Sequence, residues 1–396
     1  MIETFFLIFS FCLFLELILK YIIKFLRFKK IPWIITNQDE YPKFETKKIK
    51  TFLDKSFHKY LGWNWKPKTK HQEMIFSKTN KINFGIFGER LETNKKKKKF
   101  YDFASFGDSF VFCRYVKNNE TWQSHLTKTY SFKGLNLGVG NYGLDQIYLK
   151  YKITKIPKRI KKIYIGFVPE TLSRCLCSWK HYHEFNNIYG FKPKFIKQRG
   201  KLKLIQNPID KDENSFFQIK AIINDLKRKE FFYFEKFKNH KLSFPYFFTI
   251  LKNPIYNFKL IFFSFLKITK INENKIHDFI IKENCIKNDF YFKKKRYYEI
   301  IESLMNKIKN LSKKRGHQIT FLIFPQKYDL DIEEKNYHKF FLKLENSFDI
   351  IDFTKIFTNT KKNLKNIYLP GKYGAHLTSY GNKIVAKTII KKRRNK

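Results

Sequence analysis

Cysteine, alanine and glycine are scarce in this chain of 396 residues. The cysteines number five and contain no C-x-x-C pair, which argues against a structural zinc site, so we expect no metal. An odd number of cysteines specifies no disulfide framework, and the redox compartment stays open. They lie at Cys12, Cys113, Cys175, Cys177 and Cys285.

Acidic residues are also few, 34 against 81 Lys and Arg, which gives a formal net charge of +47. A basic stripe would indicate binding to nucleic acid or to an anionic membrane. Here the cations are spread over the whole chain, and the Lys-, Asn-, Ile- and Phe-rich composition is typical of an AT-rich bacterial genome. We therefore expect no nucleic-acid partner. The run from Lys95 to Lys99 is interpreted as a solvated loop, with contact to anionic lipid headgroups as the alternative.

The N-terminus lacks the basic start and the small-residue cleavage site of a secretory signal peptide. Phe5 to Leu15 is uncharged, Glu16 follows, and further apolar residues lead to a basic cluster from Lys24. We expect residues 1–30 to be an uncleaved, single-pass anchor in a bacterial inner membrane, with an interfacial amphipathic helix as the alternative. Positive charges after the apolar run favour a cytoplasmic domain.

Over the whole chain, 43% hydrophobic residues with 46 Phe and 23 Tyr exclude disorder along the whole length. Strand and helix patterns alternate, which predicts an α/β domain with a mainly parallel sheet and helices on both faces. A helix is expected at 120–130, capped by Asn118 or Asn119. The expected strands are 100–106, 134–137, 160–167, 319–324 and 348–353.

The rest of the chain divides around this core. Residues 31–98 are expected to be an irregular lead-in that covers the core, whose two parts are 99–177 and 293–390, and 391–396 a frayed basic tail. Residues 178–292 form an insertion with aromatic runs at 231–234, 244–248 and 260–266. We interpret it as a helical cap subdomain, with a surface that lies on lipid as the alternative.

Three sequence blocks point to chemistry. The first is Phe103-Ala-Ser-Phe-Gly-Asp-Ser109, in which a serine follows an apolar run at a bend. The second, Leu135-Asn-Leu-Gly138-Val-Gly140-Asn141, ends a further apolar run in glycines. The third, Gly374-Ala-His376, places a histidine just before a helical pattern.

In this order the blocks resemble the SGNH (GDSL-type) hydrolase family, and within it the membrane-tethered bacterial members. The resemblance runs from about Phe84 to Lys387 and includes lesser echoes at 88–90, 120–122 and 321–325. It implies a three-layer α/β/α, flavodoxin-like core. Tethered members of this kind commonly hold the domain outside the inner membrane, so the resemblance favours a periplasmic location over the charge bias.

The resemblance also implies roles. Ser109 would attack an ester carbonyl, His376 would accept its proton, and the backbone N–H groups of Ser109 and Gly140 would hold the oxyanion. No cofactor is implied. The substrate would carry an ester-linked acyl group, for instance on a cell-envelope glycan or lipid, and hydrolase and acyltransferase remain equally open. We expect Ser109 Oγ within hydrogen-bond reach of a His376 ring nitrogen.

Two departures from the family pattern concern the site. Members usually have an aspartate three residues before the histidine, where this chain has Tyr373; Asp352 or a backbone carbonyl could replace it. Where members supply an asparagine as a further oxyanion donor, this chain has Glu170, which repels an oxyanion when ionised, and Asn141 is the candidate substitute.

The remaining polar residues of the blocks are expected to be supportive. Glu170 and Arg174, four apart, are expected to form a helix-surface pair. Asp145 and Gln146 would cap a helix behind the second block, and Asp108 would brace the turn before Ser109. Because two family residues are missing, the alternative function is a catalytically inactive SGNH-fold protein that binds glycan or acts as a scaffold in the envelope.

Overall fold

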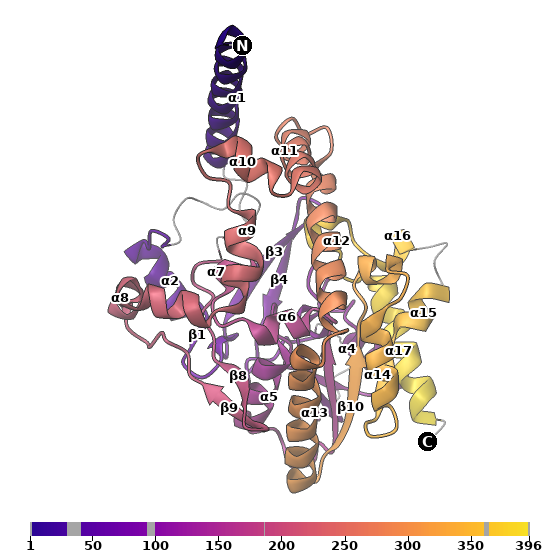
Figure 1. Cartoon of the computed structure of the whole chain (residues 1–396). Helices are drawn as coiled ribbons and strands as arrows, with labels where there is room; N and C mark the ends of the chain where they lie inside the picture. Colours follow the sequence, from indigo (N-terminus) through magenta and orange to yellow (C-terminus); the bar gives the residue numbers. More distant parts are fainter. Residues whose placement is uncertain (1, 30–40, 93–99, 186, 360–363, 395–396) are drawn as a thin grey trace. The chain divides into compact units, whose positions relative to one another are not determined.

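The computed structural model describes residues 2–29, 41–92, 100–185, 187–359 and 364–394. Figure 1 labels their helices and strands. By their internal contacts they divide into two compact units. Unit 1 comprises Met1–Leu53, Cys177–Phe191 and Pro208–Ile276, and unit 2 comprises Asp54–Leu176, Lys192–Asn207 and His277–Lys396. This division differs from the expected domains, because most of the lead-in and part of the insertion group with the core. The lysine run at 95–99 lies outside the described residues.

Unit 2 contains a five-stranded parallel sheet with the order β11-β10-β7-β5-β6. All five expected strands are confirmed with shifts of a few residues at their ends, because each is an apolar run that the sheet buries on both faces. The strands are β5 (Phe103–Gly107), β6 (Gly134–Asn136), β7 (Lys162–Phe167), β10 (Gln318–Ile323) and β11 (Ile350–Asp352).

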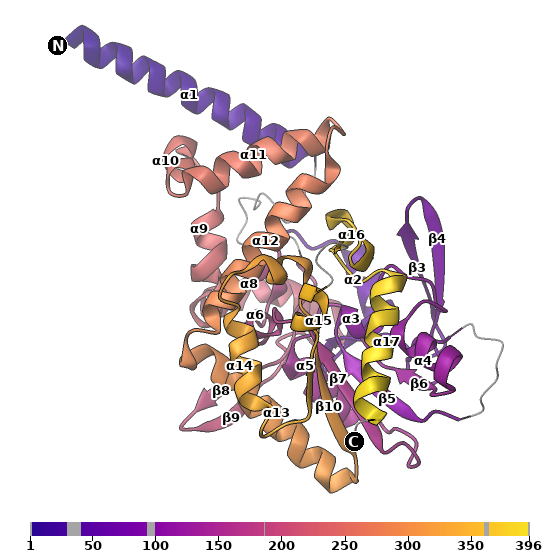
Figure 2. The same cartoon turned by 90° about the vertical axis from the view of Figure 1, so that its right-hand side faces the viewer.

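Helices cover both faces of this sheet (Figure 2). Phe103 and Tyr164 point to one face, where they join a buried cluster with Leu126 of α4 and Val385 of α17. On the other face, Phe106 packs edge-on against Tyr151 of α5, with ring centroids 5.4 Å apart. The helices of unit 2 are α3 (Ser109–Phe112), α4 (Trp122–Tyr130), α5 (Leu144–Ile153), α6 (Thr171–Leu176), α13 (Lys295–Arg315), α14 (Asn336–Leu344), α15 (Thr354–Asn359), α16 (Leu364–Ile367) and α17 (Ser379–Arg394), with the short turns η2 (Lys327–Asp331) and η4 (Gly371–Tyr373).

Three local expectations were wrong. Thr121 caps α4 by accepting from Ser124 N at 3.1 Å, because Asn118 is occupied by Arg90 Nε at 3.0 Å. The basic tail is helical as far as Arg394. The described part of the lead-in, 41–92, is regular rather than irregular, with α2 (Thr46–Lys55), the hairpin β1 (Phe57–His58) and β2 (Gly62–Trp63), and the hairpin β3 (Lys70–Ile75) and β4 (Lys78–Asn83). A further hairpin, β8 (Lys194–Gln198) and β9 (Lys201–Ile205), lies inside the insertion.

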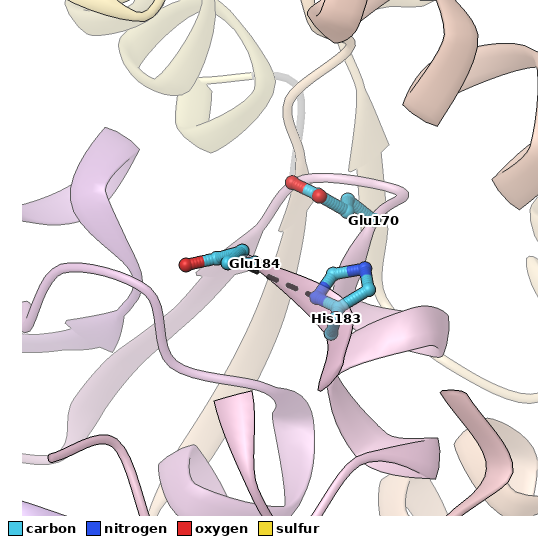
Figure 3. A group of neighbouring side chains, drawn as sticks. All are labelled: Glu170, His183 and Glu184. Atoms are coloured by element: carbon cyan, nitrogen blue, oxygen red, sulfur yellow. Dashed lines mark ion pairs between the residues drawn. The ribbon is translucent and has the colours of Figure 1, made fainter. Parts of the chain in front are cut away.

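Unit 1 is helical and rich in aromatic contacts. Trp179 stacks on Phe191 with centroids 4.6 Å apart, and Tyr233 of the aromatic run at 231–234 packs on Tyr182 at 5.1 Å. His183 Nδ1 lies 3.8 Å from Glu184 Oε1, the pair joined by a dashed line in Figure 3. The elements are α7 (Lys180–His183), α8 (Glu213–Lys229), η1 (Tyr233–Phe237), α9 (Lys238–His240), α10 (Tyr246–Leu251) and α11 (Pro254–Ile268); α12 (Glu273–Tyr291) leads into unit 2.

The first helix of unit 1, α1 (Ile2–Phe28), has 27 residues and therefore extends about 40 Å. It is long and apolar enough to cross a membrane, although a signal sequence has the same length and composition. Its N-terminal part exposes large apolar side chains, such as Phe5 at 69% and Leu7 at 72%.

Candidate active site

The turn around Ser109 joins β5 to α3. Asp108 caps α3, since its carboxylate accepts hydrogen bonds from Phe110 N and from Val168 N, both at 2.9 Å. Gly107 is required by space, because a Cβ there would lie 2.2 Å from Gly166 O on the neighbouring strand. Asp108 therefore braces the turn as expected, and Ser109 sits at the first position of the helix with 5% of its surface exposed.

The second sequence block runs beside this turn. Val139 N donates to Gly107 O at 2.9 Å, so the loop that contains Gly140 is tied to the end of β5, two residues before Ser109. A Cβ on Gly138 would lie 2.2 Å from Phe112 N, which shows how closely the loop approaches α3. Around Gly140 there is open space, since a Cβ there would meet nothing within 4 Å.

The main-chain N–H groups of Ser109 and Gly140 are both available as donors. Within the described part of the chain, neither takes part in a hydrogen bond. That of Ser109 lies at a helix N-terminus, where the first N–H groups have no intrahelical partner. An oxyanion hole requires two such donors. These two lie on neighbouring segments that follow the carboxyl ends of β5 and β6.

Trp63 holds the Gly140 peptide from the other side. Its indole Nε1 donates to Gly140 O at 3.0 Å, and the Tyr142 hydroxyl donates to the main-chain oxygen of Trp63. Trp63 therefore has a structural role that the sequence did not reveal, because the bond spans 77 positions. Behind the loop, Gln146 Oε1 accepts from Gly143 N at 3.4 Å, which confirms its capping role, and the Asp145 carboxylate binds buried Lys192 Nζ.

His376 lies next to the serine turn. Its ring centroid is 5.2 Å from that of Phe110 and 5.6 Å from that of Tyr115. Its Nδ1 donates to Tyr373 O at 2.7 Å. A carbonyl oxygen can only accept, so Nδ1 holds a proton and Nε2 is the nitrogen left to accept one.

Desolvation is the main influence on the imidazole and lowers the pKa of His376 to about 3. The hydrogen bond to Tyr373 raises this pKa, whereas the positive charges of Arg114 and Arg174 lower it further. His376 is therefore neutral at physiological pH. Among the described residues, no hydrogen bond joins Ser109 Oγ to His376, so the expected contact is not made in this structure.

Among the described residues, Asp352 forms no hydrogen bond with His376, because its carboxylate binds His338 and Thr354. One oxygen lies 2.6 Å from His338 Nδ1, and the other accepts from Thr354 N at 2.8 Å and Thr354 Oγ1 at 2.6 Å. The position expected of a third triad residue is instead filled by the backbone oxygen of Tyr373. Asp352 is the last residue of β11, two residues before α15 begins at Thr354.

Glu170 and Arg174 form the expected pair, at 2.8 Å, but in the interior rather than on the surface. Their side chains are 9% and 7% exposed, and Arg174 also lies 3.2 Å from Asp108 Oδ2 and from Tyr142 O. Burial raises the pKa of Asp108 and the nearby Arg174 lowers it. Arg174 thus ties the turn before Ser109 to the segment after β7, where Figure 3 shows Glu170.

Arg90 is a second buried arginine whose role the sequence did not reveal. Its guanidinium donates to three carbonyl oxygens at the end of α3 and just after it, those of Phe112, Cys113 and Val116, at 2.9, 2.6 and 2.5 Å. Because every residue has a main-chain carbonyl oxygen, no sequence pattern predicts these partners of Arg90. These three hydrogen bonds hold the segment that follows α3 in place.

A cavity of about 160 Å³ opens beside Gly140. Arg114 borders it and pairs with Glu73 at 3.2 Å, with the Arg114 side chain 43% exposed. The cavity is lined by Ser56, Trp63, Asn64, Trp65, His71, Phe112, Arg114, Val139, Gly140 and Asn141. A larger cavity of about 600 Å³, bordered by residues such as Lys162, Gln318 and Asp349, lies where the strands begin, and no predicted site residue lines it.

No family model matches the chain, and no curated protein matches it. A solved crystal structure aligns with 72% of this chain and 93% of its own chain, at 11% sequence identity and a TM-score of 0.33. A likeness of this size shows neither family nor function. A function must therefore be inferred from the residues of the site.

Proposed function

We propose that the chain is a membrane-anchored serine esterase or acyltransferase of the SGNH type, with a three-layer, flavodoxin-like core. The strand order supports this fold, because β6-β5-β7-β10-β11 corresponds to the order 2-1-3-4-5 of flavodoxin-like sheets. In such sheets ligands bind beyond the carboxyl ends of the strands. Ser109 and Gly140 both follow such strand ends.

The observation that carries the proposal is the combination of two unused N–H groups with a neutral histidine beside the same turn. Ser109 N and Gly140 N are free to donate among the described residues, and the Tyr373 carbonyl directs His376 Nε2 to accept a proton. A structural turn would have no need for both features. Together they supply a donor pair for an oxyanion and a base for a hydroxyl.

In the proposed reaction, Ser109 Oγ attacks the ester carbonyl carbon and its proton passes to His376 Nε2. The developing oxyanion accepts hydrogen bonds from the N–H groups of Ser109 and Gly140. His376 then returns the proton to the leaving alcohol, which leaves an acyl group on Ser109. Water or an acceptor hydroxyl releases that group after losing its proton to His376.

The missing Ser109–His376 hydrogen bond fits an unliganded site, where catalytic contacts are often long and tighten when substrate binds. The small cavity beside Gly140 is suited to a short acyl group, for example one on an envelope glycan or lipid. Asn141 lines this cavity and remains the candidate for a further donor to the oxyanion.

The test is labelling of the full-length protein with a fluorophosphonate, which reacts with activated serines. Labelling is expected in the unaltered protein, none in Ser109→Ala, and a fall of at least about a hundredfold in His376→Ala, given what a general base contributes. Ser347→Ala, which alters an exposed serine between α14 and β11, is the matched control and should label normally. Equal labelling of Ser109→Ala and the unaltered protein would contradict the proposal.

A second candidate function is an inactive SGNH-fold protein that binds glycan or acts as a scaffold. The observation that favours it is Glu170, whose carboxylate replaces the neutral amide that family members use to hold the oxyanion. A folded protein that neither labels nor cleaves acetyl esters would support this candidate.

We also propose that α1 is a single-pass anchor and holds the domain on the periplasmic side of a bacterial inner membrane. Its length and apolar composition support the anchor, whereas the side rests on the family resemblance. Protease added to intact spheroplasts should digest the domain. Digestion only after the membrane is broken would place the domain in the cytoplasm.

A further inference from the structure

The segment formed by α10 and α11 in unit 1 exposes large apolar side chains. Phe258 and Phe262 of α11 are 59% and 58% exposed, and Ile255, three residues earlier, is 72% exposed. The spacing of three and four residues places all three on one helix face. Phe244, just before α10, and Phe248 and Leu251 of α10 are exposed as well, at 70%, 66% and 47%. We call these six residues the apolar face.

The inward side of α11 has the opposite character. Asn257 and Ser264 are 1% and 0% exposed, with Leu260 between them at 1%. Asn257 Nδ2 donates to Ile250 O at 3.0 Å, which joins α11 to the end of α10, and Ser264 Oγ donates to Leu260 O at 2.6 Å. A helix on a soluble protein buries its apolar stripe and exposes its polar one. Polar and small residues inside, with Phe and Ile outside, are typical of a helix in contact with lipid.

The segment that carries the apolar face also contacts α1, the helix long enough to cross a membrane. Phe25 of α1 stacks on Phe265 of α11, with centroids 6.2 Å apart and planes at 17°. Arg27 Nη2 donates to Leu242 O at 2.6 Å, just before α10. Figure 2 shows α11 alongside the C-terminal part of α1.

Glu16, the one acidic residue in the middle of α1, is satisfied by the same segment. Its carboxylate accepts from the main-chain N–H groups of Tyr246 and Phe247 at the start of α10. An unpaired carboxylate is costly in hydrocarbon, and these two hydrogen bonds satisfy the carboxylate of Glu16. Glu16, whose charge would otherwise oppose insertion of α1, thus joins α1 to α10.

The charge of the segment fits anionic lipid. Residues 244–272 contain no Asp or Glu, whereas Lys252, Lys259 and Lys270 are exposed there. Long lysine side chains can reach the headgroups while Phe and Ile enter the acyl region. A second copy of this basic surface would repel the first, which argues against a dimer as the occupant.

We propose that α10 and α11 lie in the plane of the membrane surface, with the apolar face embedded in anionic lipid beside α1. Unit 1 then has two membrane elements, one inserted and one interfacial. Such helices embed about 5–10 Å into the boundary between headgroups and acyl chains. The proposal does not depend on the esterase activity.

The experiment uses the full-length protein in vesicles of phosphatidylcholine and phosphatidylglycerol, which include a lipid with a diazirine on its acyl chain. After illumination, adducts are mapped by mass spectrometry. Peptides with Phe258 and Phe262 should gain at least about tenfold more adduct than the peptide with Phe217, as expected for embedded rather than aqueous side chains. Phe217 is a matched control, because it is 43% exposed on α8 of the same unit.

Adducts confined to α1, with α11 at the level of Phe217, would overturn the proposal. Cross-links between two α11 peptides in place of lipid adducts would do so as well, because they would identify a second copy as the occupant. Vesicles without phosphatidylglycerol should reduce α11 labelling several-fold and leave α1 labelling unchanged, because the lysines favour anionic headgroups. Equal labelling of α11 in both lipids would remove the electrostatic part of the proposal.

Discussion

The main-chain oxygen of Tyr373 lies 2.7 Å from Nδ1 of His376, at the chain position where the resembling family has an aspartate. A neutral carbonyl orients the ring as a carboxylate would, but it stabilises the imidazolium less. The ring is also desolvated, and the pKa of His376 is lowered to about 3. The base is therefore held in its neutral form, and this leads to a prediction about pH.

Tyr373→Asp should raise the pKa of His376, because a carboxylate would then face Nδ1. The unaltered protein should label with fluorophosphonate at similar rates at pH 5.5 and pH 8, since His376 is neutral at both. In the variant the rate should fall as the pH is lowered through the raised pKa. Tyr373→Asn, which adds no charge, is the control and should keep the flat profile. A flat profile in Tyr373→Asp would show that the two groups do not interact.

The same lowered pKa predicts a dependence of stability on pH. In the unfolded chain His376 takes up a proton near its ordinary pKa of 6.5, whereas in the folded chain it does so only near 3. Below pH 6.5 the unfolded state therefore binds more protons, and stability should decrease as the pH falls towards 3. His376→Gln removes this contribution. The difference in denaturant midpoint between the two proteins should change between pH 7 and pH 5; a constant difference would contradict the assignment.

Asp352→Asn should have little effect on the chemistry. Its carboxylate binds His338 and Thr354, so we expect the labelling rate to change less than about threefold, whereas loss of the charge from a triad aspartate costs about 10⁴-fold. His338→Gln removes the same pair from its other side and should behave alike. A loss of several thousandfold in Asp352→Asn alone would return Asp352 to the catalytic machinery.

Trp63→Phe should slow labelling, because it removes the donor that holds Gly140 O. We expect about a tenfold decrease, less than the hundred- to thousandfold that loss of an oxyanion donor costs. Trp65→Phe is a matched control two residues away, since Trp65 Nε1 has no hydrogen-bond partner among the described residues. Equal rates in the two variants would mean that the Trp63 bond does not position the loop.

The strands of unit 2 were predictable because parallel strands buried on both faces are continuous apolar runs, such as 160–167. The serine turn and the glycine loop were predictable because both follow such runs. The partner of His376 was not, since it is a backbone oxygen and any residue at position 373 would supply one. The Asp352–His338 pair likewise joins two elements whose pairing no local pattern reveals.

The orientation of α11 shows a different limit. Its composition is apolar on average, and hydropathy alone does not say which side faces inward. Asn257 points inward and hydrogen-bonds to the main chain of α10, and Ser264 points inward and hydrogen-bonds within α11. Phe258 and Phe262 are therefore left exposed. The aromatic runs of the insertion therefore differ: Phe232 and Tyr233 of the run at 231–234 are buried, whereas the runs at 244–248 and 260–266 expose aromatic side chains such as Phe244 and Phe262.

Arg174→Met should destabilise unit 2, because it leaves the carboxylates of Asp108 and Glu170 buried without their cation. Removing one member of a buried ion pair typically costs about 3–5 kcal/mol. Arg174 lowers the pKa of Asp108, so without it that pKa rises, and the folded state is relieved as Asp108 takes up a proton. The loss should therefore be larger at pH 8 than at pH 5. Denaturant unfolding followed by circular dichroism measures both values.

The matched variants separate charge from packing. Arg174→Met combined with Glu170→Gln removes one stranded charge and should recover part of the lost stability. Asp225→Asn, which alters an ion pair on the exposed surface of α8, should leave the unfolding midpoint unchanged. If Arg174→Met lost the same stability at both pH values, its effect would come from lost packing, and Asp108 would not depend on Arg174 for its charge.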